Sequence, residues 1–488
     1  MTTVRAALGV DCGDYSLRAA AWRDGRTETV EDADGQDLAP AALALDGVWM
    51  FGRRAADNPK AVYEMKSNLS DPQWTAGRSL NLTAAEALRR VLQRAVGAWR
   101  DRIRPAAVEV TGVVCPASYG MRQRNILESV IQQSGLAEMV WINEPEAAVL
   151  GAQETEGEWL TSVLGEEEEA VLVMDVGGRR STASVVSAVK RREHLRLTLV
   201  AQRSAQVGAE DVLSRLAELL CDQQVGGHKE DPGWRRLARQ ERRAVSTGEE
   251  PVAVCVPAEL GGGDVSASLQ EWEQRAAAEL ESIAQVAAEC GEAAETILQT
   301  VSPSRRERRR AGRRQRCIAG GGGWLLAPVA RRLSFLSPVG GEDAIRGAPF
   351  VLSVGAARYA AVCSGLSTEF DFASPDRPGI GVELANGCLD PVLPPDWQAG
   401  DIGDRIYTNS EDLSGAVILR FLEGFAREAA SNALIHEHHI PVASTELRQL
   451  RLALNLSAYD ESKVGVTAGP VFGTGQPIEQ FILHVGTR

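Results

Sequence analysis

Lysine is scarce in this sequence, and long apolar runs are missing. Five lysines stand among 52 basic residues, and 66 acidic residues bring the net charge to −14. A chain with this much negative charge repels nucleic acid and anionic lipid, so neither is an expected partner. No apolar run approaches the roughly 18 residues that span a membrane, and the first residues lack the pattern of a signal peptide. We therefore expect a cytoplasmic protein without a membrane partner.

Closely spaced cysteines are missing as well. The eight cysteines are dispersed and none forms a C-x-x-C pair, which argues against a disulfide framework or a zinc knuckle. With 44% hydrophobic and 24% charged residues, the composition is that of a globular protein. A length of 488 residues allows about three compact units.

An aspartate followed by a glycine turn occurs twice at the end of a short apolar segment. Asp11 is followed by Gly13, and Asp175 is followed by Gly177 and Gly178. Turns of this kind let backbone N–H groups approach phosphate oxygens, because no Cβ stands between them. Two such turns predict a polyphosphate site, in which the aspartates hold a hydrated Mg²⁺.

Strand-like and helical patterns alternate along most of the chain. Residues 83–103, for example, have helical spacing after a capping box, and the alternation predicts an α/β core with mixed sheets. Residues 366–380 are rich in Pro, Ser and Asp and predict a linker. From residue 381 onward, short runs of alternating polarity predict an all-β domain. The arginine-rich run at 305–316 is expected to be a solvated loop.

The order of seven short motifs is more specific than any one glycine turn. They are G-V-D-C-G-D-Y (9–15), N-P-K-A-V-Y-E-M-K (58–66), C-P-A-S-Y-G-M-R-Q-R (115–124), I-N-E-P-E-A-A (142–148), D-V-G-G (175–178), V-G-A-E-D (207–211) and G-G-G-G (320–323). In this order they resemble the heat shock protein 70 (DnaK-type) chaperones of the actin-like ATPase superfamily. The resemblance implies an α/β fold with a two-lobed, actin-like nucleotide-binding domain at 1–365. It also implies an interdomain linker at 366–380 and an all-β sandwich that binds peptide at 381–488.

The resemblance further implies a site for ATP or ADP with Mg²⁺. Lys66 matches the lysine that orients the attacking water, and Glu144 and Asp175 complete the implied catalytic set. Asp11 and Asp175 match the aspartates that hold Mg²⁺ through water. The residues implied around the nucleotide are Asp11, Gly13, Asp14, Tyr15, Gly177, Gly178, Arg179, Arg180, Gly208, Arg242, Arg243, Ser246, Gly320, Gly321 and Trp324. Among them, Arg242, Arg243 and Ser246 fall where the family grips adenosine, and Trp324 replaces an arginine that stacks on adenine.

Departures from the family pattern gather at the phosphates. The first turn of the family reads D-L-G-T-T, but here Asp14 and Tyr15 replace the two threonines. In the second turn, Arg179 and Arg180 replace a glycine and a threonine. Two like charges 4 Å apart repel by roughly 4 kcal/mol at an effective dielectric of 20, so Asp14 disfavours phosphate. Three alternatives stay open: the arginines bind phosphate, Asp14 pairs with Arg180 and fills the position of the γ-phosphate, or the arginines face solvent.

Two further features of the resemblance concern communication and peptide binding. Pro116 and Arg124 match a proline–arginine relay that reports the nucleotide state to the partner domain. Residues 381–394 and 454–468 resemble opening and closing strands of the peptide-binding domain, where an extended peptide would lie between loops. The sequence ends without a long amphipathic helical segment, so we expect a lidless member from which peptide leaves quickly.

Together these observations predict a divergent Hsp70-like chaperone that binds ATP and unfolded or extended peptide segments. Co-chaperones are expected partners, and ATP hydrolysis is expected to be weak or lost. The alternative is a non-hydrolysing pseudo-ATPase scaffold that binds a dedicated protein partner. A sugar kinase on the same core is less expected, since such kinases do not continue into a β-sandwich.

Overall fold

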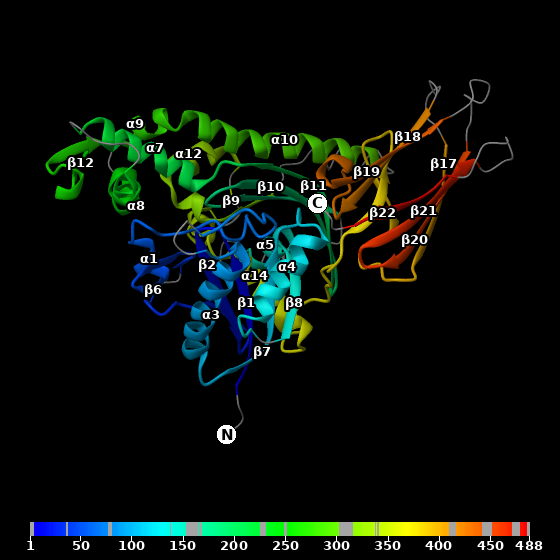
Figure 1. Cartoon of the computed structure of the whole chain (residues 1–488), viewed down its shortest axis with the longest axis horizontal. Helices are drawn as coiled ribbons and strands as arrows, with labels where there is room; N and C mark the ends of the chain where they lie inside the picture. The colour runs from blue at the N-terminus through cyan, green and yellow to red at the C-terminus, as the bar shows by residue number, and fades with distance from the viewer. Residues whose placement is uncertain are drawn as a thin grey trace.

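The computed structural model describes most of the chain, whose course is shown in Figure 1. The described residues are 4–35, 38–76, 81–136, 138–152, 164, 168–224, 231–247, 251–301, 316–336, 338, 341–408, 416–441, 451–470 and 479–485. Apart from Arg316, the arginine-rich run 305–316 therefore lies outside the described residues. Among the helices that are described, none is both long and apolar enough to cross a membrane.

The first part of the chain is built on a mixed sheet with the strand order β3-β2-β1-β7-β8 and a short β4 beside β2. The strands are β1 (Arg5–Cys12), β2 (Ser16–Arg23), β3 (Arg26–Thr29), β4 (Ala39–Pro40), β7 (Ala107–Cys115) and β8 (Glu138–Asn143). The other elements here are β5 (Leu43–Asp46), β6 (Val48–Phe51), α1 (Gly52–Ala56), α3 (Ala84–Ile103), α4 (Met121–Gln132) and α5 (Glu144–Gly151). β1 is antiparallel to β2 and parallel to β7, and it is buried from its second residue onward. The predicted capping box of Thr83 and Glu86 opens α3.

A second mixed sheet has the order β11-β10-β9-β14. Its strands are β9 (Glu169–Val176), β10 (Ser181–Arg191), β11 (His194–Ala205) and β14 (Arg316–Gly320). The elements around it are α7 (Ala209–Asp222), α8 (Pro232–Thr247), β12 (Val252–Cys255), β13 (Asp264–Ala267), α9 (Leu269–Arg275), α10 (Ala277–Val301), α12 (Ala327–Arg332), α13 (Gly341–Gly347) and α14 (Val351–Cys363). In Figure 1 the long green helix α10 runs above the β10 and β11 strands, whereas α14 lies below them.

The two sheets are joined through α5 and α14. α14 packs on β1, β2 and β7 of the first sheet and on α5. The two helices approach so closely that a Cβ on Gly151 or Gly355 would collide with the backbone of the other helix. One apolar cluster extends from Ile142 at the end of β8, through Leu352 of α14, to Val173 of β9. The ends of β1 and β9 are therefore held at fixed positions on either side of this helix pair.

The last part of the chain forms two antiparallel four-stranded sheets, ordered β16-β15-β18-β19 and β17-β20-β21-β22. The strands are β15 (Gly379–Glu383), β16 (Leu389–Leu393), β17 (Ile402–Thr408), β18 (Ala416–Gly424), β19 (Ala433–Pro441), β20 (Arg451–Asp460), β21 (Lys463–Pro470) and β22 (Glu479–His484). They share one apolar core that includes Trp397, Phe421 and Leu454. In Figure 1 they form the orange and red end of the molecule. The chain is thus a mixed α/β protein, as predicted, and its described C-terminal part is built of strands.

Candidate functional site

A polar cleft of about 370 Å³ lies where the turn after β1 meets the turn after β9. Its volume is within the range of pockets that bind small molecules. The predicted residues that the structure brings together around it are Asp11, Gly13, Asp14, Tyr15, Lys66, Pro116, Glu144, Asp175, Gly177, Gly178, Arg179 and Arg180. The two aspartate–glycine turns therefore face one common space, although 164 positions separate Asp11 from Asp175 in the sequence.

Lys66 and Glu144 form an ion pair at the wall of the cleft. Glu144 is the first residue of α5, directly after β8, and its Oε1 lies 3.3 Å from Lys66 Nζ. Burial alone would lower the pKa of Lys66, but the carboxylates of Glu144 and Asp11 outweigh burial and raise that pKa above its ordinary value. Lys66 therefore stays a fixed cation that can orient a phosphate or a water but cannot serve as a base.

Arg18 is the cleft residue that the sequence analysis missed. Its Nη1 lies 2.8 Å from Oδ2 of Asp11, and the two side chains are only 9% and 4% exposed. The pair arises because Asp11 and Arg18 are directly opposite in the antiparallel register of β1 and β2. Opposite charges at such positions attract, so counting outward from the Gly13 turn would have found this pair in the sequence. Arg18 stands in an otherwise apolar stretch of β2, which was the visible signal.

Asp175 has no such counter-ion beside it. It lies at the end of β9, opposite Gly320 of β14, and its Oδ1 is buried without a hydrogen-bond partner in the part of the chain that the structure describes. Burial, followed by the charges of Glu144 and Asp11, raises the pKa of Asp175 to about 7. Gly321 turns away at a φ of +80°, and a Cβ there would collide with this oxygen. Gly320 and Gly321 thus pack against Asp175 and lie outside the lining of the cleft.

The side chains that replace the family's two threonines are both engaged within the protein. The ring of Tyr15 stacks on Tyr63 with centroids 5.1 Å apart, and a Cβ on Gly178 would collide with it. The first turn therefore packs an aromatic ring against the second. Asp14 accepts hydrogen bonds from the backbone N–H of Ser67, at 2.8 Å, and from the Ser67 hydroxyl.

Asp14 and Arg180, which are both described, do not form the ion pair that was one of the alternatives. Ser67 instead binds Asp14. Arg179 is half-exposed, with its guanidinium 3.9 Å from Glu64 and 4.0 Å from Asp211. This alternative is therefore wrong, because a serine donor and not an arginine satisfies the extra carboxylate.

Several residues implied at the nucleotide lie away from this cleft. Trp324 is 1% exposed and its indole Nε1 donates to the carbonyl of Met174 at 2.9 Å. We correct the expectation for Trp324, since a ring packed in the core offers no face to a base. Gly208 packs against the carbonyl groups of the second turn, and Arg242 donates to the carbonyl of Arg239 on its own helix. The side chains of Arg243 and Ser246 lie outside the described residues.

Comparison with known proteins identifies the relatives of this chain. No protein-family model matches the sequence. It is 26% identical to the chaperone protein HscA of Serratia proteamaculans (strain 568) over 48% of this chain and 40% of that protein. It is 20% identical to the chaperone protein DnaK of Mycoplasmopsis agalactiae over 92% of this chain and 75% of that protein. It is 23% identical to DnaK of Deinococcus proteolyticus over 87% of this chain and 70% of that protein.

The chain is a divergent relative of the Hsp70 chaperones. The resemblance found in its motifs is thereby confirmed at the level of the family. The match to HscA spans less than half of that protein's length, whereas the matches to DnaK extend over most of both chains.

In this Hsp70 relative, Arg124 connects the cleft region with the later parts of the chain. Its Nη2 donates to Asn143 Oδ1 at 2.5 Å, directly before Glu144. Its Nη1 donates to the carbonyl of Asp376 at 3.3 Å, within the segment 366–380. Its guanidinium also lies over the ring of Phe425, 4.8 Å from the centroid. Pro116 itself lines the cleft.

The surroundings of Asp11 do not fit the hydrated Mg²⁺ that the Hsp70 resemblance implies. Mg²⁺ needs an octahedral shell of oxygen ligands, but Oδ2 of Asp11 already accepts an N–H of Arg18. The guanidinium beside it would also repel a dication. Among the residues that the structure describes, no three or more His, Cys, Asp or Glu side chains gather into a metal site.

Proposed function

We propose that this protein is an Hsp70-like chaperone that binds a nucleotide in the cleft and an extended peptide on its C-terminal sheets, with weak or no hydrolysis of ATP. In this proposal residues 1–365 form a two-lobed, actin-like nucleotide-binding domain. Residues 366–380 link it to a β-sandwich peptide-binding domain at 381–488. The observation that carries the proposal is the convergence of the turns after Asp11 and Asp175 on one cleft beside the Lys66–Glu144 pair.

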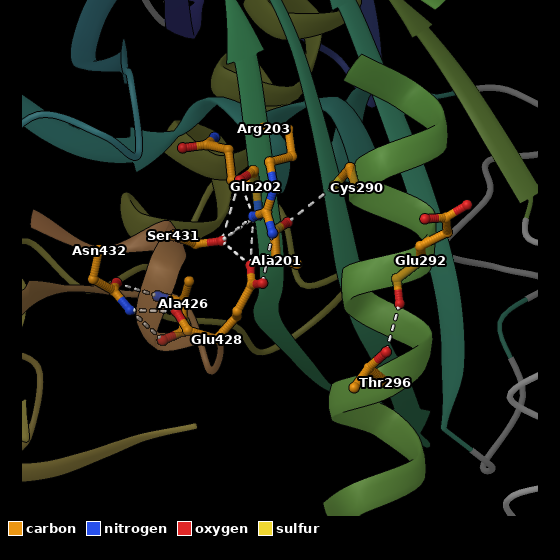
Figure 2. A network of polar contacts seen from close by, with 10 residues as sticks. All are labelled: Ala201, Gln202, Arg203, Cys290, Glu292, Thr296, Ala426, Glu428, Ser431 and Asn432. Atoms are coloured by element: carbon orange, nitrogen blue, oxygen red, sulfur yellow. Dashed lines mark hydrogen bonds and ion pairs between the residues drawn. The ribbon is translucent and has the colours of Figure 1, made fainter. Parts of the chain in front are cut away.

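The wall of this cleft is continuous with a contact to the C-terminal part. Ser204 of β11 lines the cleft, and its neighbour Arg203 binds Glu428 through two hydrogen bonds of 2.6 Å. Figure 2 shows this network, in which the hydroxyl of Ser431 also reaches the backbone of Gln202. A change of β11 on ligand binding would therefore act directly on the segment that follows β18.

Backbone hydrogen bonds add to this contact. The N–H groups of Arg427 and Glu428 donate to the carbonyls of Leu199 and Val200, both at 2.9 Å. Charged hydrogen bonds with two parallel contacts have strict geometry, so small displacements of Arg203 or Glu428 would weaken this partly buried pair. We infer that this contact transmits the state of the cleft to the peptide-binding part.

The C-terminal sheets leave apolar side chains exposed that could receive a peptide. These residues are Ile402, Ile406, Ile418 and Ile482. Ile402 and Ile406 share one face of β17, because alternate side chains of a strand point the same way. The exposed pair Ile402 and Ile406 supports binding of an extended apolar segment along β17.

The proposal is tested by measuring nucleotide and peptide binding together. Calorimetry with ATP should show saturable binding, and a labelled apolar peptide should change its affinity at least about threefold when ATP is present. In Arg203→Ala this response should be lost while ATP binding persists. Arg196→Ala, on the exposed side of the same strand, is the matched control. ATP binding without any effect on peptide in the native protein would contradict the coupling.

The second candidate is a non-hydrolysing scaffold that binds a dedicated protein partner. Two observations favour it. Arg18 donates a hydrogen bond to the carboxylate of Asp11, and the ring of Tyr15 packs against Gly178. Calorimetry with ATP separates the candidates, because both allow hydrolysis to be absent. A native protein that binds no nucleotide would overturn the nucleotide-binding chaperone and leave the scaffold.

A further inference from the structure

Arg18 is a buried cation inside the cleft for which the proposed function has no role. Its Nη1 is bound to Asp11, and its Nη2 lies beside Gly322 of the third glycine turn. Its Nε is buried and has no hydrogen-bond partner among the described residues. An unsatisfied buried donor costs about 1–3 kcal/mol, so an acceptor from a ligand would be favourable at this position.

The charges around the cleft are balanced without a metal. Its lining contains four carboxylates and four cations, so its formal net charge is zero. Three of the cations are arginines, Arg18, Arg179 and Arg180, and without them the same lining would carry −3. A cleft with that negative charge would need a metal ion before it could accept a polyphosphate. Here arginines of the chain itself bring positive charge to the lining, although Arg179 also faces Glu64 and Asp211 outside it.

A guanidinium group is well suited to take the place of a metal ion beside phosphate. It remains charged at every physiological pH, and its planar set of N–H donors matches the oxygens of a phosphate. Arg18 is also held in place, since its side chain is 91% buried and paired across the β1–β2 hairpin. It therefore keeps one N–H on Asp11 and has others for a phosphate oxygen.

We propose that the cleft binds its phosphate-bearing ligand without a divalent metal, with the guanidinium of Arg18 in the metal's place. This inference rests on the proposed function, because it assumes that a nucleotide enters the cleft. It departs from the metal dependence that the Hsp70 resemblance implies, and it assigns the difference to one residue that opposes Asp11.

The first experiment compares ATP binding in excess MgCl₂ and in EDTA, using the full chain and calorimetry. We expect the Kd in EDTA to lie within about threefold of the value in Mg²⁺, or to be lower, since free ATP carries more negative charge. A Kd more than about tenfold weaker in EDTA would overturn this inference and leave the proposed function intact. Binding in neither condition would overturn both.

The second experiment removes the cation. Arg18→Gln should weaken ATP binding in EDTA by at least about tenfold, and should gain saturable binding of Mn²⁺, used as a paramagnetic probe of the released Asp11. Arg23→Gln, at the exposed end of the same strand, is the matched control and should change neither result.

Arg18→Lys and the native protein keep the test decisive if Arg18→Gln does not fold. The lysine variant retains the charge without the planar donors, so ATP binding in EDTA should be intermediate. Native protein should show no saturable Mn²⁺ binding. Saturable Mn²⁺ binding by the native protein that ATP competes for or strengthens would overturn the inference, since a metal would then fit beside Arg18.

Discussion

The two aspartate–glycine turns look alike in sequence but differ in their charge environment. Asp11 lies 2.8 Å from the guanidinium of Arg18, whereas one oxygen of Asp175 has no partner among the described residues and the pKa of Asp175 is raised to about 7. The difference arises from the neighbouring strand: β2 places an arginine opposite Asp11, whereas β10 places Thr182 opposite Asp175. A repeated motif therefore fixes the position of a carboxylate but does not fix its protonation.

The largest expected effect comes from removing the cation that pairs with Asp11. Arg18→Met leaves Asp11 as a buried charge without a cation, and we expect the free energy of unfolding to fall by about 3–5 kcal/mol. Urea unfolding followed by circular dichroism measures the change. Arg23→Met, which removes an exposed pair with Glu28, should cost less than about 1 kcal/mol. Equal losses in the two variants would show that the Asp11–Arg18 pair is not buried as described.

The second environment predicts a dependence on pH. Native Asp175 holds its proton up to about pH 7, while in the unfolded chain it has the ordinary value of 3.8. The native state binds more protons between these values, so this carboxyl makes the free energy of unfolding fall as the pH rises from about 4 to 7. Asp175→Asn should remove the share of the slope that Asp175 contributes and stabilise the protein at pH 7.5 by a few kcal/mol.

Asp14→Asn is the control for this pH experiment. Asp14 lines the same cleft, but two hydrogen bonds from Ser67 hold its carboxylate. Its amide variant should therefore keep the slope between pH 4 and 7. If Asp175→Asn kept the slope as well, the raised pKa of Asp175 would be contradicted.

A third carboxyl, Glu146 of α5, sharpens the comparison because it is buried but well bonded. Burial raises its pKa to about 7, while hydrogen bonds from Ser374 and Asn143 act in the opposite direction. As with Asp175, the free energy of unfolding should fall as the pH rises from about 4.5 to 7. Glu146→Gln should reduce the fall in the free energy of unfolding between pH 4.5 and 7 by about 1–3 kcal/mol, which is less than the effect of Asp175→Asn. A larger effect for Glu146→Gln in urea unfolding would reverse the ranking of the two sites.

The sequence predicted the strands and turns of the cleft better than its side-chain contacts. The apolar segments that became β1, β9 and β14 were visible because buried strands consist of continuous apolar residues. The meeting of Asp11 and Asp175 was predicted from the repeated aspartate–glycine turn, and the family resemblance supported it. Arg18 was missed because its role depends on strand register, which a one-residue shift would abolish.

Trp324 is a residue for which the sequence predicted a role that its packing excludes. The resemblance placed Trp324 where the family has an arginine that stacks on adenine, but the indole is packed in the core, where the carbonyl of Met174 accepts its N–H. Which way a side chain faces after a glycine turn depends on the tertiary packing. The motif order was sufficient for the family and the fold class, while the environment of each cleft residue needed coordinates.

The smallest effect is expected from the ring that joins the two turns. Tyr15→Thr restores the hydroxyl of the family and removes the ring from Gly178 and Tyr63. Because the phosphate-binding space widens, we expect the Kd for ATP to fall about three- to tenfold, equivalent to roughly 1 kcal/mol. Calorimetry measures it, with Tyr459→Thr, an exposed tyrosine on β20, as the control. Unchanged ATP binding by Tyr15→Thr would contradict the expectation that the ring narrows the phosphate-binding space. Weaker binding would mean that the ring supports the ligand and that the two turns cooperate through Tyr15.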